Sequence, residues 1–134
     1  MVRTGEHIPL PPGTEEIATK IVDAAYTIYK ALGPGLLENV YEVCFFHELE
    51  KRGLAYQRKV SVPITYDGIT INEGLRQDVL VERKVICELN AVETLNDVDQ
   101  AQLLSQMKLT GKRLGFLMDF NVAVIQYGIK GMTL

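Results

Sequence analysis

The amino-acid sequence predicts an α/β protein in which helices flank one central mixed β-sheet. Two stretches in the first half repeat apolar residues every three or four positions, as amphipathic helices do. The chain then changes to alternating apolar and polar residues, as half-buried strands do. Its 134 residues, 47% of them hydrophobic, suffice for one core but not for two ordinary domains. We therefore expect a single domain over residues 14–134.

The predicted helices come first. Residues 1–13 contain three prolines and no periodicity, so we expect an N-terminal tail there. Thr14 can cap a helix whose apolar stripe runs to the glycine-proline-glycine turn at residues 33–35. A second helix follows at once and ends at Gly53. The short connection keeps the two helices side by side.

The strands are expected after Gly53. Residues 56–66 alternate up to the dipeptide Asp67-Gly68, which favours a tight hairpin turn, and a return strand begins at Ile69. Pro63 cannot donate to a ladder, so the first strand belongs at a sheet edge or beside a bulge. Two more strands at residues 75–82 and 85–92 are expected to form the centre of the sheet.

The last part of the chain predicts one helix and two strands. Asn96 or Asp97 can cap a third helix that runs to about Leu109. Strands at residues 113–119 and 122–128 then complete the domain. The predicted order of elements is ααββββαββ.

The composition argues against some classes of function. The net charge of −3 argues against strong non-specific binding to duplex nucleic acid. Basic residues still gather in two stretches, which are either binding patches or solvated edges: Lys51, Arg52, Arg58 and Lys59, then Lys108, Lys112 and Arg113. No membrane span, signal layout or disulfide framework is visible, so we expect a cytoplasmic protein with reduced cysteines and no membrane partner.

The predicted strand at residues 85–92 carries two polar residues that need an explanation. Side chains alternate across a strand, so Glu88 and Asn90 share one face, and a hairpin can bring Asp78 alongside Glu88. Two adjacent carboxylates repel each other unless a cation such as Mg²⁺ joins them. The alternative is ordinary ion pairing, which would join Asp78 to Arg76 or Arg83, and Glu88 to Lys84 or Lys108.

Four blocks in fixed order resemble one known family. Residues 35–41 read GLLENVY and match the signature GxxExxY, directly after Gly33-Pro34. Residues 76–78 read RQD and residues 88–91 read ELNA, and the predicted third helix reads AQLL from residue 101 and closes with KLTG at residues 108–111. From about residue 15 to its end, the chain resembles the GxxExxY family of the PD-(D/E)XK nuclease-like superfamily.

The resemblance implies a restriction-endonuclease-like core and a set of site residues. Asp78, Glu88 and the backbone carbonyl of Leu89 would hold Mg²⁺ or Mn²⁺ beside a phosphodiester of DNA or RNA. Glu38 would approach the metal or its water from the helix, and Gln102 would position the site. Hydrolysis of nucleic acid is the activity that this arrangement implies.

Two departures from the family pattern bear on this activity. Asn90 stands where the family has a lysine, and asparagine cannot offset charge in the transition state. The chain is therefore either an impaired nuclease or an inactive nuclease-fold module that binds nucleic acid or a protein partner. Lys84 or Lys108 could take the role of the lysine. Gln106 replaces a tyrosine that could stack on a base.

Further contacts are expected by analogy with the family. Tyr41, Lys84, Gln106 and Lys108 are the residues that we expect to touch nucleic acid. A small acidic subunit gains a binding groove by pairing, so a homodimer is also expected.

Overall fold

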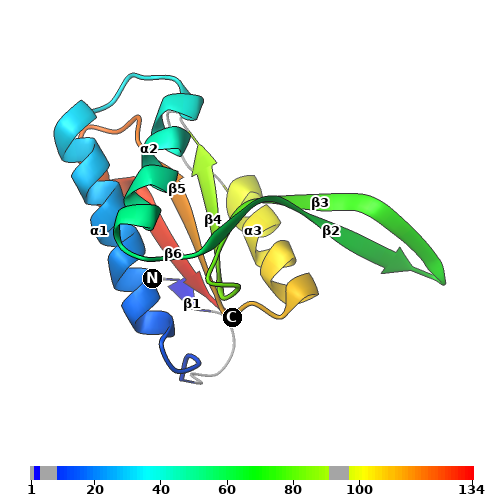
Figure 1. Cartoon of the computed structure of the whole chain (residues 1–134). Helices are drawn as coiled ribbons and strands as arrows, with labels where there is room; N and C mark the ends of the chain where they lie inside the picture. The colour runs from blue at the N-terminus through cyan, green and yellow to red at the C-terminus, as the bar shows by residue number, and fades with distance from the viewer. Residues whose placement is uncertain (1, 4–8, 91–96) are drawn as a thin grey trace.

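The computed structural model describes residues 2–3, 9–90 and 97–134 (Figure 1). Their elements form one six-stranded sheet in the order β1-β6-β5-β4-β3-β2, with helices on both faces. Two strand pairs, β1 with β6 and β4 with β5, are parallel and the others antiparallel. The elements are β1 (Val2–Arg3), α1 (Thr14–Leu32), α2 (Glu38–Lys51), β2 (Tyr56–Tyr66), β3 (Ile69–Val81), β4 (Val85–Asn90), α3 (Asp97–Thr110), β5 (Leu114–Asp119), the 3-10 helix η1 (Ile125–Tyr127) and β6 (Ile129–Thr133). The predicted fold class is confirmed.

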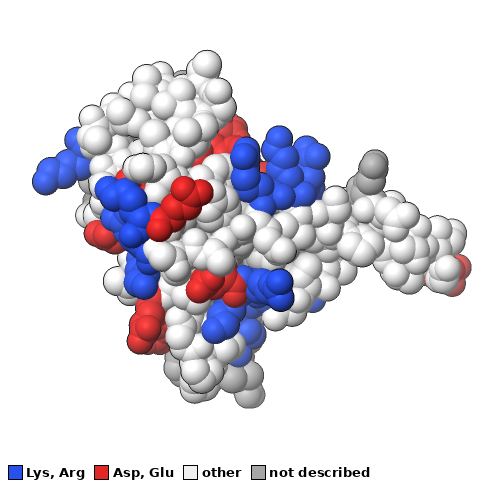
Figure 2. All heavy atoms as spheres, viewed as in Figure 1, with Lys and Arg blue, Asp and Glu red and all other residues white. Residues whose placement is uncertain are grey.

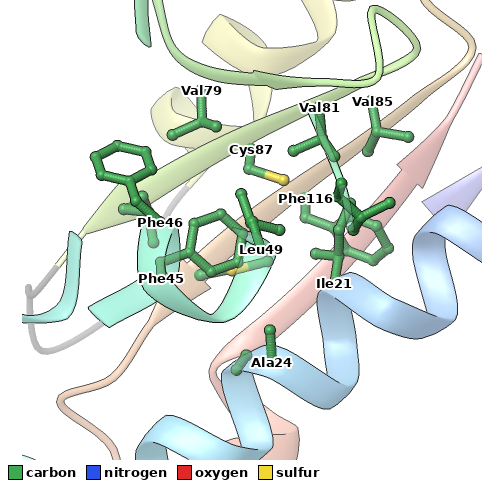
Figure 3. Packing of buried hydrophobic residues seen from close by; sticks show 14 of the residues in the cluster. Ile21, Ala24, Phe45, Phe46, Leu49, Val79, Val81, Val85, Cys87 and Phe116 are labelled. Atoms are coloured by element: carbon green, nitrogen blue, oxygen red, sulfur yellow. The ribbon is translucent and has the colours of Figure 1, made fainter. Parts of the chain in front are cut away.

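Helices α1 and α2 cover one face of the sheet with the larger apolar core (Figure 3). Helix side chains such as Ile21, Phe45 and Leu49 pack there against alternate strand residues, among them Val79 and Cys87. The strand residues that point into this core are Val79 and Val81 of β3 and Val85, Cys87 and Leu89 of β4. The side chains of the intervening residues point to the opposite face of the sheet.

Helix α3 covers that opposite face. Its buried Leu103 and Met107 pack against Ile86 and Leu117. Gly115 permits the close approach, because a side chain there would come within 2.9 Å of Leu103 Cδ1 and 3.0 Å of Met107 Sδ. The glycine thus holds α3 directly over the middle strands.

The first two helices and the hairpin follow the prediction closely. Asp67 and Gly68 form the turn between β2 and β3 with φ values of 48° and 76°, the left-handed conformation that such a turn requires. Strand β2 is an edge strand and its register shifts between Val62 and Ile64, so Pro63 occupies the position expected of it. Thr14, however, does not cap α1 with its side chain; it is already the first helical residue, after Gly13 in left-handed conformation.

Other expected boundaries are wrong. Residues 69–81 form one continuous strand where two were expected, because the irregularity opposite Pro63 does not break the pairing. Three strands therefore separate α2 from α3 instead of four. The middle of the sheet is β4 with β5, since β6 and the tail residues Val2–Arg3 add strands beyond β5. The expected cap Asn96 lies outside the described residues.

The last strand also begins later than expected, at Ile129 rather than at residue 122. The Asp119 carboxylate accepts a hydrogen bond from the Asn121 N–H at 2.8 Å, which turns the chain, and η1 follows. The Asp119 N–H then donates to the Gly128 carbonyl at 2.7 Å, and the ladder resumes from there. None of the helices in the described ranges is both long and apolar enough to cross a membrane.

Candidate active site

The site begins where the pairing of β3 with β4 stops. The two strands are paired up to Val79 and Cys87, and the next opposed residues would be Asp78 and Glu88. Beyond this point a side chain takes the place of the backbone partner, because Asp78 Oδ2 accepts a hydrogen bond from the Leu89 N–H at 3.1 Å. The two strands thus place both carboxylates at one opening, on the face that α3 covers.

The backbone of Leu89 offers a further oxygen at this opening. The N–H and C=O of a strand residue point to the same side, and the Leu89 N–H points toward Asp78. The Leu89 carbonyl therefore faces the same gap, where β3 no longer supplies a partner in the ladder. Binding of a metal ion by this carbonyl remains a prediction.

Glu88 is held in surroundings that oppose its negative charge. Its Oε1 atom is buried without a hydrogen-bond partner. Burial, followed by the charge of Asp78 and a hydrogen bond to it, raises the pKa of Glu88 from 4.5 to about 8, although a hydrogen bond from Gln106 acts in the opposite direction. Near neutral pH this glutamate holds a proton unless a cation replaces it.

Helix α3 completes the surroundings of Glu88. A small cavity of about 50 Å³ is lined by Glu88, Asp99, Gln102, Gln106 and Leu117. The helix therefore brings Gln102 to the same cavity as Glu88, and its role in positioning the site remains a prediction. It also adds Asp99, a carboxylate that the sequence analysis did not single out, one helical turn before Gln102.

The alternative of ordinary ion pairs has no support in this structure. Within the described ranges, neither carboxylate is paired with any of the four basic residues considered for it, which are Arg76, Arg83, Lys84 and Lys108. The donors at the two carboxylates are instead the Leu89 N–H at Asp78, and the Asp78 N–H and the Gln106 amide at Glu88. In the part of the chain that the structure describes, no basic side chain is paired with either carboxylate.

Glu38 lies at the start of α2, exposed, and approaches the pair from the other side. Burial raises its pKa, and the charges of Asp78 and then Glu42 add to the shift. The charge of Asp78 thus acts on Glu38, but Glu38 does not form a three-residue metal site with Asp78 and Glu88. The described residues contain no group of three acidic, histidine or cysteine side chains that could hold a metal ion. The role of Glu38 at a metal remains a prediction.

Position 90 lies at the end of β4, where the backbone of Asn90 pairs with that of Asp119 on β5. Asp119 is buried, its Oδ2 has no hydrogen-bond partner, and burial raises its pKa. It lies on the same face of the sheet as Glu88. The sequence analysis placed residue 119 at the end of a strand and did not assign Asp119 to the site; its place after an apolar run of strand residues was the available signal.

Lys59 is a second residue that the sequence analysis did not assign to the site. It lies between the cross-strand pairs Arg58 with Val79 and Val60 with Gln77, so its backbone is opposite Asp78. Its φ of 51° is unusual for a residue inside a strand. Only the register of β2 against β3 reveals this position.

The expected nucleic-acid contacts fall in four different settings. Tyr41 is buried and stacks on Phe120, and its hydroxyl donates to the Gly33 carbonyl at 2.7 Å, so it fixes the α1–α2 turn. Gln106 is buried beside Glu88. Lys84 lies before the first residue of β4, at the end remote from Glu88, and its Nζ is 3.4 Å from the Pro12 carbonyl. Lys108 is exposed in the last turn of α3.

The donor set has a definite chemical character. Two carboxylates, one of which has a buried oxygen without a hydrogen-bond partner, and one backbone carbonyl suit a hard divalent cation, which prefers oxygen ligands and keeps several waters. Such a cation would supply the charge that the surrounding side chains lack.

Comparison with known proteins gives one match. A family model described as the PD-(D/E)XK nuclease superfamily matches residues 15–132. No curated protein and no solved structure matches the chain significantly. The matched segment contains both carboxylates, helices α2 and α3, and all of α1 except Thr14.

Proposed function

The chain belongs to the PD-(D/E)XK nuclease superfamily, and from this premise we propose that it is a metal-dependent phosphodiesterase acting on nucleic acid. The observation that carries the proposal is the pair Asp78 and Glu88, two adjacent carboxylates without a compensating cation. A fold that needed these residues only for stability would gain from a basic neighbour. Two adjacent carboxylates with a perturbed pKa are instead typical of a ligand-binding site.

The ligand that fits is Mg²⁺ or Mn²⁺, held by Asp78, Glu88 and the Leu89 carbonyl. Such an ion polarises a phosphoryl oxygen and lowers the pKa of a bound water. Asp78 is fixed by the Leu89 N–H, and Gln106 orients Glu88. Glu88 must release its proton for the ion to bind, so binding should strengthen as the pH rises toward about 8.

Catalysis should be slow because Asn90 replaces the usual lysine. An asparagine amide can orient water but cannot carry positive charge. Lys59 is the cation that we propose for this role, since its backbone lies opposite Asp78. Its long side chain can reach a phosphate bound beside the carboxylates.

A second candidate function is a nuclease-fold module that binds nucleic acid or protein without cleavage. Asn90 and the net charge of −3 favour it. The motif at residues 35–41 further supports assignment to the GxxExxY family, with a cytoplasmic, homodimeric protein as the working expectation.

Cleavage of labelled single- and double-stranded DNA and RNA in Mg²⁺ or Mn²⁺ tests the proposal. We expect weak cleavage by the wild type, an increase of about two orders of magnitude in Asn90→Lys, and a loss in Lys59→Ala. Lys20→Ala on α1 is the matched control, and Asp78→Ala in the Asn90→Lys background should abolish activity. Absence of cleavage in every variant, combined with retained binding of nucleic acid, would establish the second function.

A further inference from the structure

The hairpin of β2 and β3 leaves the body of the molecule as a long arm (Figure 1). Val62, paired with Leu75, is the last buried residue of β2 before the arm. Residues 63–74, which we call the arm, extend beyond this pair. Their two strands pair only with each other, and a free two-stranded hairpin is marginally stable in water.

One face of the arm is apolar. Residues opposite each other in a ladder share a face, and the pairs Tyr66 with Ile69 and Ile64 with Ile71 alternate with Thr65 and Thr70. The apolar pairs therefore lie together and the threonines lie on the reverse side. Tyr66 is 72% exposed, Ile69 62% and Ile71 48%, so this face has no cover within the described chain.

Charge decides which kind of partner could cover it. Residues 60–75 contain no lysine or arginine, and their two charged residues are Asp67 and Glu73. Figure 2 shows the arm without blue atoms and with red atoms at its tip. A phosphate backbone would be repelled there, whereas an apolar protein surface with a basic edge would be attracted.

The root of the same arm offers such a surface. A hollow of about 330 Å³ lies between β3 and α3 and is lined by Leu75, Val98, Ala101, Gln102 and Ser105. Arg76 is exposed next to Leu75, and in the part of the chain that the structure describes it has no acidic partner. The molecule thus carries an apolar, acidic tip and an apolar, basic root.

We propose that this arm is a dimerisation element, and that two copies of the chain exchange arms around a two-fold axis. A two-fold contact requires a surface complementary to itself, and tip and root supply the two halves. In this arrangement each apolar face packs on the other copy, and each Asp67 lies near the other copy's Arg76. Gln102 lines both the hollow and the cavity over Glu88, so each arm also reaches the edge of the partner's candidate active site.

Sedimentation equilibrium of the whole chain tests the proposal without metal or substrate, so its outcome is separate from that of the nuclease proposal. We expect a dimer, and a dissociation constant at least about 100-fold higher in Tyr66→Ser/Ile69→Ser, because two large apolar side chains leave the interface. Thr65→Ser/Thr70→Ser, on the reverse face, is the control and should dimerise as the wild type does. Circular dichroism and thermal melting verify that each variant is folded.

A charge exchange tests the geometry. Asp67→Arg and Arg76→Asp should each weaken the dimer, and the double variant should restore it, because the pair is re-formed in reverse across the axis. A wild type that stays monomeric at about 100 μM would overturn the proposal, as would a dimer insensitive to Tyr66→Ser/Ile69→Ser. Loss of oligonucleotide binding in these variants, with no change in association, would assign the arm to nucleic acid instead.

Discussion

Glu48 and Glu88 are glutamates in the interior of the same small protein, but their pKa values move in opposite directions. The Glu48 carboxylate binds Arg52 at 2.6 Å and Lys51 at 3.4 Å, and the hydrogen bond from Arg52 is the main cause of its lowered pKa. Arg52 in turn binds Asp23 at 2.7 Å and so joins α2 to α1. Glu88 has another carboxylate as its neighbour, and its pKa is raised to about 8.

The comparison separates a carboxylate that supports folding from one available for binding. On the helical side of the molecule, the buried charge of Glu48 is met by the Arg52 guanidinium and the Lys51 ammonium group. At the end of the β3–β4 ladder two carboxylates lie together, and Oε1 of Glu88 has no hydrogen-bond partner. That arrangement costs stability, and under the proposed function a bound cation offsets the cost.

The largest expected effect is the loss of metal binding when the pair is broken. Asp78→Ala or Glu88→Gln should reduce the affinity for Mn²⁺ by about two orders of magnitude or more, because each removes one of two charged ligands. Calorimetric titration measures this. Glu48→Gln is the matched control, and a similar loss in that variant would remove the distinction between the two glutamates.

The pH dependence of stability should also distinguish the two residues. Glu88 binds its proton more tightly in the folded state, so its contribution to stability is full below about pH 4.5 and is lost as the pH rises to about 8. Glu88→Gln should remove this decline, which amounts to at most about 1.4 kcal/mol per pH unit. Urea denaturation between pH 4 and 9, without metal, measures the free energy of unfolding of the wild type and of Glu88→Gln. The same dependence of stability on pH in both proteins would contradict the raised pKa of Glu88.

Glu48 should behave in the opposite way. Glu48→Gln should cost about 2 to 3 kcal/mol near neutral pH, at the low end for a buried pair because Arg52 keeps some contact with water. Since the pKa of Glu48 is lowered, this cost should fade as the pH drops below 4.5. The same denaturation series tests it, with no change expected in metal affinity.

A smaller effect is expected at Gln106, which donates to Glu88 from α3. Gln106→Leu removes a group that favours the charged form, so the pKa of Glu88 should rise and metal affinity near neutral pH should fall about tenfold. Gln102→Leu, on the exposed side of the same cavity, should leave the Glu88 pKa unchanged. Equal effects in both variants would argue for a general disturbance of α3.

The convergence of Asp78 and Glu88 could be predicted from the sequence because it depends on local rules. Alternation along a strand and a short turn fix which residues share a face, and the hairpin at Asp67 and Gly68 follows from the conformation that its turn requires. The family model at residues 15–132 agrees with the motifs that indicated the superfamily.

Features that depend on the register of distant strands could not be predicted. The position of Lys59 opposite Asp78 and that of Asp119 beside Asn90 follow from pairing across the sheet, which no local pattern specifies. The late start of β6 has a similar cause, because the hydrogen bonds of Asp119 shift the chain before pairing resumes. The apolar residues 122–125 resemble a strand until those bonds are known.

The most direct test of the account is a calorimetric titration of the wild type with Mn²⁺ near pH 7, in two buffers of different ionisation enthalpy. The account predicts binding with release of about one proton per metal ion, and loss of that proton release in Glu88→Gln. No binding up to millimolar metal, or binding without proton release, would contradict it.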